Sequence, residues 1–278
     1  MSNVPFSPVR VLLIARNTLL EAARQKLFHF LLLLALALVL GAQSFRDFNF
    51  GAPELKFLAD FGFGAMAFFG AALTVTATAQ LFFSEIENRT ALTLLAKPVW
   101  RTEFILGKYL GVAAVAAVFC ALLTALLAGV LWWRAAALVR EFPEAFASGV
   151  ALEWGAFFAA AFAQWLKLAV LAAFTLLVAS FAQTQLFAVA TGFFILVICH
   201  LQYLAQDAYV RAGTVAGRAL AGTLALLFPN FQVFNLADSL GSASAPTAAD
   251  LARLTLYAFG YVAAVCALAA FSFRKREI

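Results

Sequence analysis

The sequence predicts an all-α membrane protein with six transmembrane helices. Of its 278 residues, 65% are hydrophobic and only 12% are charged, whereas soluble domains are about 45–50% apolar and about 25% charged. A soluble core of this size could not bury so much apolar surface. The apolar runs approach or exceed about 20 residues, the length of a helix that crosses a bilayer core of about 30 Å, whereas barrel strands alternate over about 10 residues.

The first element, residues 8–26, is expected to be an amphipathic helix in the membrane interface. Pro8 stands where a helix can begin. One face is apolar and another carries polar residues, namely Arg10, Asn17, Glu21 and Arg24. A cleaved signal peptide is the competing interpretation, but the charged region is too long for one.

Six apolar ranges follow that are expected to span the membrane: 27–43, 57–83, 104–133, 154–181, 186–204 and 251–273. The segment 213–236 is ambiguous because its apolar part, Val215 to Phe228, is short and ends at Pro229-Asn230. Such a length is typical of a re-entrant or interfacial segment, here an outer helical hairpin before the last span. The whole chain, 1–278, is interpreted as one transmembrane domain.

Charge predicts the orientation of these spans. With both termini in the cytosol, eleven basic and five acidic residues lie inside, against seven basic and nine acidic residues outside. The positive-inside rule favours this topology, and a seventh span would move Arg274-Lys275-Arg276 outside.

One cytosolic loop, residues 84–103, has the pattern of a short capped helix. Ser84 and Glu87 have the spacing of a capping box, and Lys97 before Pro98 predicts where the helix stops. A second helix is expected to start near Thr102-Glu103 and to enter the membrane. A short helix with a mixed surface suits a groove on a partner protein, although an ordinary connector is an alternative.

Two strings in the sequence resemble a known family. The first contains Asn88-Arg89-Thr90, Leu94-Leu95-Ala96-Lys97-Pro98-Val99 and Gly107-Lys108-Tyr109-Leu110-Gly111, and it resembles the coupling-helix region of type-2 ABC exporter permeases. The second, Phe228-Pro229-Asn230-Phe231 followed by Phe234-Asn235-Leu236, is similar to a segment in permeases of the nitrous-oxide-reductase maturation branch.

The resemblance implies that the loop is a coupling helix that docks on a separate cytosolic ABC ATPase. The residues that would bind this partner are Glu85, Glu87, Arg89, Leu92, Leu95, Lys97, Pro98 and Arg101. It also implies a dimer with a second permease chain, identical or related, in a bacterial-type inner membrane. The chain has no G-x-x-x-x-G-K-[ST] string, so ATP and Mg²⁺ are expected in the partner. No catalytic residue, metal, cofactor or nucleic-acid partner is expected for this chain.

Polar residues inside the spans are further candidates for a pathway or an interface. Lys167 lies deep in the range 154–181, with Gln164 one turn before it. A lysine there costs about 2.5–3.5 kcal/mol, which favours a functional role, but snorkelling toward the cytosolic interface explains it equally well. Thr74 and Thr78 share a helix face, where close helix packing is a simpler explanation than substrate contact.

We therefore expect the permease subunit of an ATP-driven exporter. The alternative is a non-transporting membrane anchor or scaffold for a cytosolic complex, and the presence of a Walker-type ATPase partner would distinguish the two. The sequence does not define the substrate.

Overall fold

The computed structural model describes residues 6–44, 54–87, 100–144, 153–211, 214–240 and 246–274. Every secondary-structure element in these ranges is a helix, which confirms the all-α prediction. The long helices are α1 (Pro8–Arg24), α2 (Lys26–Gly41), α3 (Glu54–Glu87), α5 (Arg101–Glu141), α6 (Trp154–Phe181), α7 (Gln185–Arg211), α8 (Val215–Leu227) and α9 (Ala248–Arg274). Two 3₁₀ turns, η2 (Phe231–Phe234) and η3 (Leu236–Ser239), connect α8 to α9.

Seven segments of the described chain are long and apolar enough to cross a membrane, one more than the six ranges predicted. The additional segment, Val215–Asp238, is not one continuous helix, because α8 ends at Leu227 and η2 and η3 follow. The Pro229-Asn230 pair accounts for this break. Proline cannot continue a helix, and the Asn230 side chain accepts a hydrogen bond of 2.9 Å from Gln232 N to start η2.

Helix α6 forms the centre of the bundle. Within its most hydrophobic window, 83% of the residues are buried, against 28% for α2 and α7. It packs against α3, α5, α7 and α9, and many of its buried residues are alanines. Small side chains let helices approach closely inside a membrane, where lipid provides no hydrophobic drive for association.

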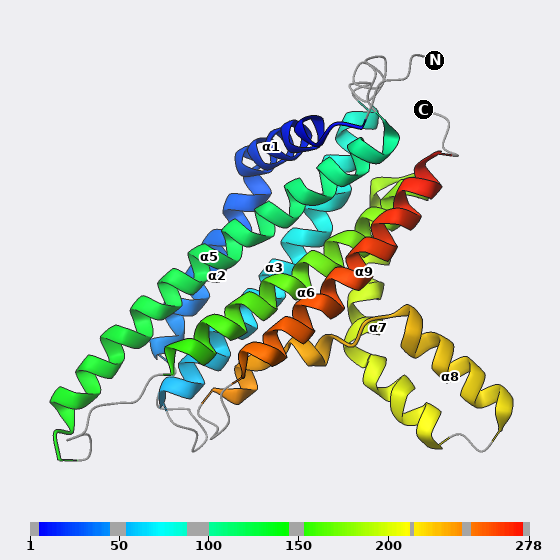
Figure 1. Ribbon diagram of the computed structural model, residues 1–278. Helices are drawn as coiled ribbons and strands as arrows, with labels where there is room; N and C mark the ends of the chain where they lie inside the picture. Colours follow the sequence, from blue (N-terminus) through cyan, green and yellow to red (C-terminus); the bar gives the residue numbers. More distant parts are fainter. Residues whose placement is uncertain are drawn as a thin grey trace.

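Figure 1 shows that α2, α3, α5, α6 and α9 run between the two ends of an elongated bundle. Both termini lie at the end that carries α1, together with the end of α3 and the start of α5. Helix α8 packs against α7 and lies at the opposite end, without returning to the end that holds the termini (Figure 1). Segments distant in sequence therefore gather at the end of α3 and the start of α5. Residues 88–99, which connect these two helices in the sequence, lie outside the described residues.

One sequence prediction about this end is wrong. Ser84 does not start a capped helix, because α3 continues through it to Glu87. The Ser84 hydroxyl instead donates to Glu21 Oε1 at 3.2 Å. The second helix starts at Arg101, close to the predicted Thr102-Glu103.

Candidate functional site at the ends of α3 and α5

The first turn of α5 is anchored by Glu103, a fully buried carboxylate. Its oxygens accept hydrogen bonds from Arg10 Nε at 3.0 Å and Arg10 Nη2 at 2.7 Å, and from the backbone of Ser7 at 2.7 Å. Glu103 also accepts from the backbone N–H of Trp100 at 3.0 Å, which caps α5 itself. One side chain thus fixes the starts of both α1 and α5, and its hydrogen bond raises the pKa of the Arg10 guanidinium.

Two glycines on α5 let α1 lie directly against it. A Cβ at Gly107 would stand 2.6 Å from Ile14 Cβ, and one at Gly111 would collide with Thr18. Thr18 is fully buried and donates its hydroxyl back to Ile14 O at 2.9 Å. The Gly107–Gly111 pair therefore acts as a small-x-x-x-small contact surface for α1 rather than as part of a nucleotide loop.

The adjacent residue, Lys108, joins α5 to the last turns of α3. Its Nζ lies 2.6 Å from Glu85 Oε1 and donates to Leu81 O at 2.8 Å. The two side chains are nearly inaccessible, with exposed fractions of 1% for Lys108 and 8% for Glu85. A buried charge needs both a counter-charge and hydrogen bonds, and this arrangement supplies both across the ends of the two helices.

A third contact ties the start of α5 to the end of α9. Arg101 donates to Phe273 O at 2.9 Å and to Arg274 O at 2.8 Å, and its guanidinium lies 5.7 Å from the centre of the Phe273 ring. Terminal helix carbonyls have no partner within their own helix and carry the negative end of the dipole, so a cation is well placed there. The Phe273 ring also stacks on Phe104 of α5.

The first turns of α5 are therefore a junction that holds α1, α3 and α9 together. The helix ends that flank residues 88–99 are the end of α3 and the start of α5.

The predicted partner-binding residues divide into two groups. Glu85 and Arg101 lie in this junction and make inward contacts, and the backbone of Glu87 ends α3. Arg89, Leu92, Leu95, Lys97 and Pro98 lie outside the described residues.

Thr74 and Thr78 are both buried, with exposed fractions of 2%. Thr78 donates to Thr74 O at 2.6 Å, within α3. One turn away, a Cβ at Gly70 would stand 2.7 Å from Leu168 of α6. The contacts of Thr78 and Gly70 show close packing on this part of α3.

Lys167 and Gln164 line a second polar site, a cavity of about 330 Å³ between α3, α6 and the η2–η3 segment. The Lys167 ammonium lies 6.0 Å from the centre of the Phe231 ring, on η2. The Lys167 side chain therefore lies beside η2, which follows α8 in the chain. Asp60 of α3 and Asp238 of η3 also line this cavity.

Several contributors to these sites were not among the predicted site residues, including Glu103, Lys108, Arg10, Asp60 and Asp238. The sequence offered one signal, since Lys108 and Glu103 lie in the string that resembles the coupling region. Their partners, Glu85 and Arg10, are 23 and 93 residues away, and no local pattern identifies such pairs.

The family comparison covers nearly the whole chain. The model of the family described as "ABC-2 family transporter protein" matches residues 12–278. A comparison with curated proteins gives no match. The all-helical fold, the seven membrane-length segments and this match together establish a multi-pass membrane protein with a permease role. The chain belongs to the ABC-2 family of transporter proteins.

Proposed function

We propose that the chain is the membrane-spanning subunit of an ABC exporter and that a separate ATPase drives it through residues 84–103. The observation that carries this proposal is the junction at the start of α5. Its buried contacts to α1, α3 and α9 surround the two helix ends that flank residues 88–99. A segment that only connected two spans would not need such an anchor.

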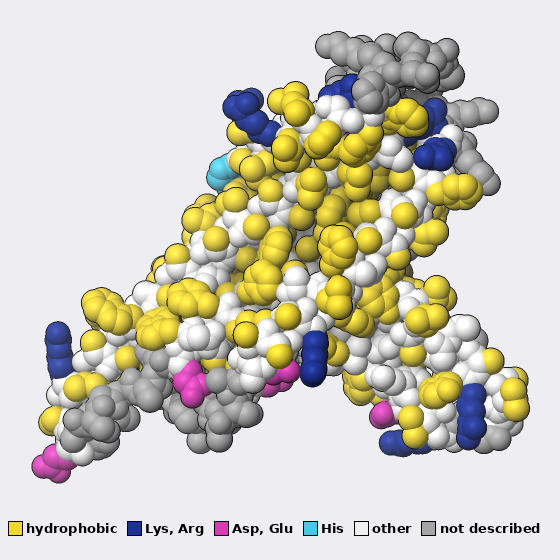
Figure 2. Space-filling view, viewed as in Figure 1, with side chains coloured by type: hydrophobic (Ala, Val, Ile, Leu, Met, Phe, Trp, Pro, Cys, Tyr) yellow, Lys and Arg dark blue, Asp and Glu magenta, His cyan; other side chains and the backbone are white. Residues whose placement is uncertain are grey.

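Six spans fit this role better than seven. Helix α8 has 13 residues, about 20 Å at 1.5 Å per residue, which is too short for a core of about 30 Å. Six crossings leave both termini and α1 on one side of the membrane. Figure 2 shows basic side chains at that end, and acidic as well as basic ones at the opposite end, which supports a cytosolic location for the termini.

In this proposal α1 is an interfacial helix that moves with α5. Its exposed large apolar residues are Val9, Leu12, Leu13 and Leu20, whereas Val11, Thr18 and Ala22 are buried. Exposed apolar side chains on a helix beside a membrane end suit the headgroup region. The salt bridge between Arg10 and Glu103 then makes α1 part of the element that an ATPase would displace.

Coupling would proceed by rigid-body displacement. Closure of two ATPases on ATP and Mg²⁺ would push the 88–99 segment, and the Glu85–Lys108 pair would keep the ends of α3 and α5 together during that movement. A second permease chain, identical or related, would complete the pathway in a bacterial-type inner membrane.

Charge insertion in residues 88–99 tests this proposal. We expect Leu92→Glu or Leu95→Glu to abolish co-purification of the ATPase from mild detergent, while the chain still inserts in the membrane. The matched control is Val215→Glu at the start of α8, a site with 88% exposure at the opposite end of the bundle. The control should still co-purify with the ATPase. Co-purification that neither Leu92→Glu nor Leu95→Glu reduces would contradict the assignment. Absence of any ATPase from the wild-type preparation would favour a membrane scaffold.

A further inference from the structure

We propose that the cavity around Lys167 binds a zwitterionic group, with an anionic part at Lys167 and a cationic part at Asp60 and Asp238. This inference rests on the proposed transport function in one respect, since it names the chemical class of the molecule that is transported. The binding site itself is defined by the side chains of this chain alone.

The inner part of the cavity requires an anionic partner. Lys167 is 7% exposed and Gln164 is 6% exposed. Among the described residues, no carboxylate lies within ion-pair distance of the Lys167 ammonium, and Gln164 Nε2 has no hydrogen-bond partner. The Phe231 ring offers the lysine only a cation–π contact. A buried cation and a buried amide donor that line one cavity suit phosphate or carboxylate oxygens.

The other part of the cavity favours a cation. Asp60 and Asp238 line it and are solvent-exposed. Asp238 is held in place, since Asn235 Nδ2 donates to its Oδ2 at 2.7 Å and Lys56 Nζ donates to its backbone oxygen at 3.2 Å. The Lys56 ammonium offsets one of the two carboxylates, so this part keeps a net negative charge. A purely anionic ligand would meet that negative charge, and a purely cationic one would meet Lys167. A ligand with both charges satisfies both parts.

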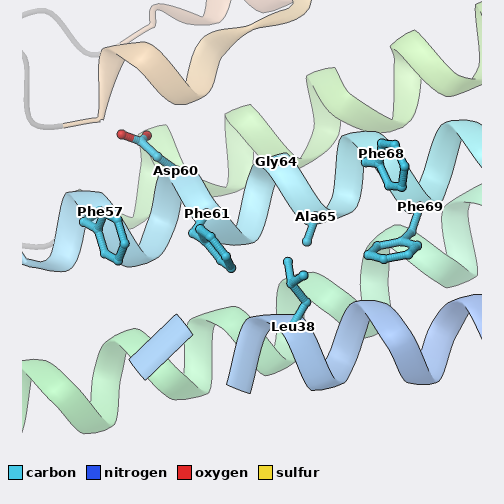
Figure 3. A pocket seen from close by; sticks show the side chains of 8 residues that line it. All are labelled: Leu38, Phe57, Asp60, Phe61, Gly64, Ala65, Phe68 and Phe69. Carbon is cyan, nitrogen blue, oxygen red and sulfur yellow. The ribbon is translucent and has the colours of Figure 1, made fainter. Parts of the chain in front are cut away.

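An apolar groove adjoins the cavity along α3. It has a volume of about 560 Å³ and shares Asp60 and Gly64 with the polar cavity. Figure 3 shows Phe57 and Phe61 on the side of α3 where Leu38 of α2 lies, whereas Asp60 points to the opposite side. A Cβ at Gly64 would meet no atom within 4 Å, so the missing side chain leaves the passage between the two spaces open. A zwitterionic headgroup in the cavity could thus extend an acyl chain into the groove.

Binding to the purified full-length chain in detergent tests this site without any ATPase. The probes are dihexanoyl phosphatidylethanolamine, free phosphoethanolamine, and dihexanoyl phosphatidylglycerol as the anionic comparison. We expect the wild type to prefer the ethanolamine lipid. Lys167→Gln should weaken its binding by about tenfold or more, the effect of losing one charge-assisted hydrogen bond. Arg211→Gln, which removes an exposed charge at the end of α7, should leave binding unchanged.

Two further variants separate the parts of the site. Asp60→Asn combined with Asp238→Asn should shift the preference toward phosphatidylglycerol, because the carboxylates no longer repel it. Leu38→Trp, at a residue that lines the groove but not the polar cavity, should weaken binding of the lipid but not of free phosphoethanolamine if acyl chains use the groove. Lipid binding that Leu38→Trp leaves unchanged, while both probes still depend on Lys167, would indicate a soluble zwitterion as the ligand. The unfolding midpoint of each variant shows that it is folded.

Binding of no probe, or binding that Lys167→Gln leaves unchanged in a folded protein, would overturn the inference. Lys167-dependent binding in a chain that recruits no ATPase would support the cavity and refute the transport proposal. The two failures are therefore distinguishable.

Discussion

Replacing Lys108 with Met should destabilise the protein strongly, whereas adding Glu85→Gln should restore most of the loss. Lys108 Nζ lies 2.6 Å from Glu85 Oε1 and 2.8 Å from Leu81 O, and both side chains are almost inaccessible. Removal of one partner of a buried ion pair leaves an uncompensated charge and costs about 3–5 kcal/mol. Replacement of both charged groups removes that penalty and is often nearly neutral.

The assay is reversible unfolding in mixed micelles with increasing SDS, followed by tryptophan fluorescence. It is applied to the wild type, both single variants and the double variant, which together form a double-mutant cycle. Lys26→Met is the matched control, since Lys26 starts α2 with an exposed side chain. We expect its change in unfolding free energy to stay within about 0.5 kcal/mol.

Two results would refute this reasoning. The first is a Lys108→Met protein whose stability matches that of the Lys26→Met control. The second is a double variant that is no more stable than Lys108→Met alone. Either result would show that the ion pair does not hold the ends of α3 and α5 together.

Two other contacts of the junction yield predictions. Gly111→Leu should destabilise the docking of α1 by about 1–3 kcal/mol, because the leucine side chain would collide with Thr18. The control is Gly129→Leu, whose site faces open space. Faster proteolysis of α1 in Gly111→Leu than in the control would confirm the prediction, and equal rates would contradict it. Arg101→Met should free the last carbonyls of α9, at a cost of about 1 kcal/mol. Hydrogen exchange should then quicken in the turn that ends at Arg274, and unchanged exchange there would argue against the contact.

Hydropathy predicts the helices well because the bilayer requires long apolar segments that satisfy their own backbone hydrogen bonds. Every backbone polar group in lipid needs an internal partner, so an apolar run of sufficient length forms a helix. The range 154–181 coincides with α6. The range 104–133 fell short, since α5 continues to Glu141. Arg134 lies beyond the predicted end of this range, yet it is buried and forms ion pairs with Glu54 and Glu141. Glu54 is distant from it in sequence.

The same long-range pairing explains why Ser84 lies within α3 and does not start a new helix. Glu85 and Glu87 follow the apolar run 57–83, a pattern that predicts the start of a new helix. Helix α3 instead continues, because Lys108 neutralises Glu85 within the bundle. Lys167 was recognised as unusual, but its direction depends on the return of the η2–η3 segment over α6, which no local pattern determines.

Site-specific photocrosslinking tests the central claim most directly. Benzoylphenylalanine is placed at position 92, at position 95, and at Val215 as the control, and the crosslinked partners are identified by mass spectrometry after irradiation of cells. We predict that positions 92 and 95 crosslink to a protein with a Walker A motif and that position 215 does not. Crosslinks from 92 and 95 only to lipid, or to a protein without that motif, would contradict a permease that is driven through residues 84–103.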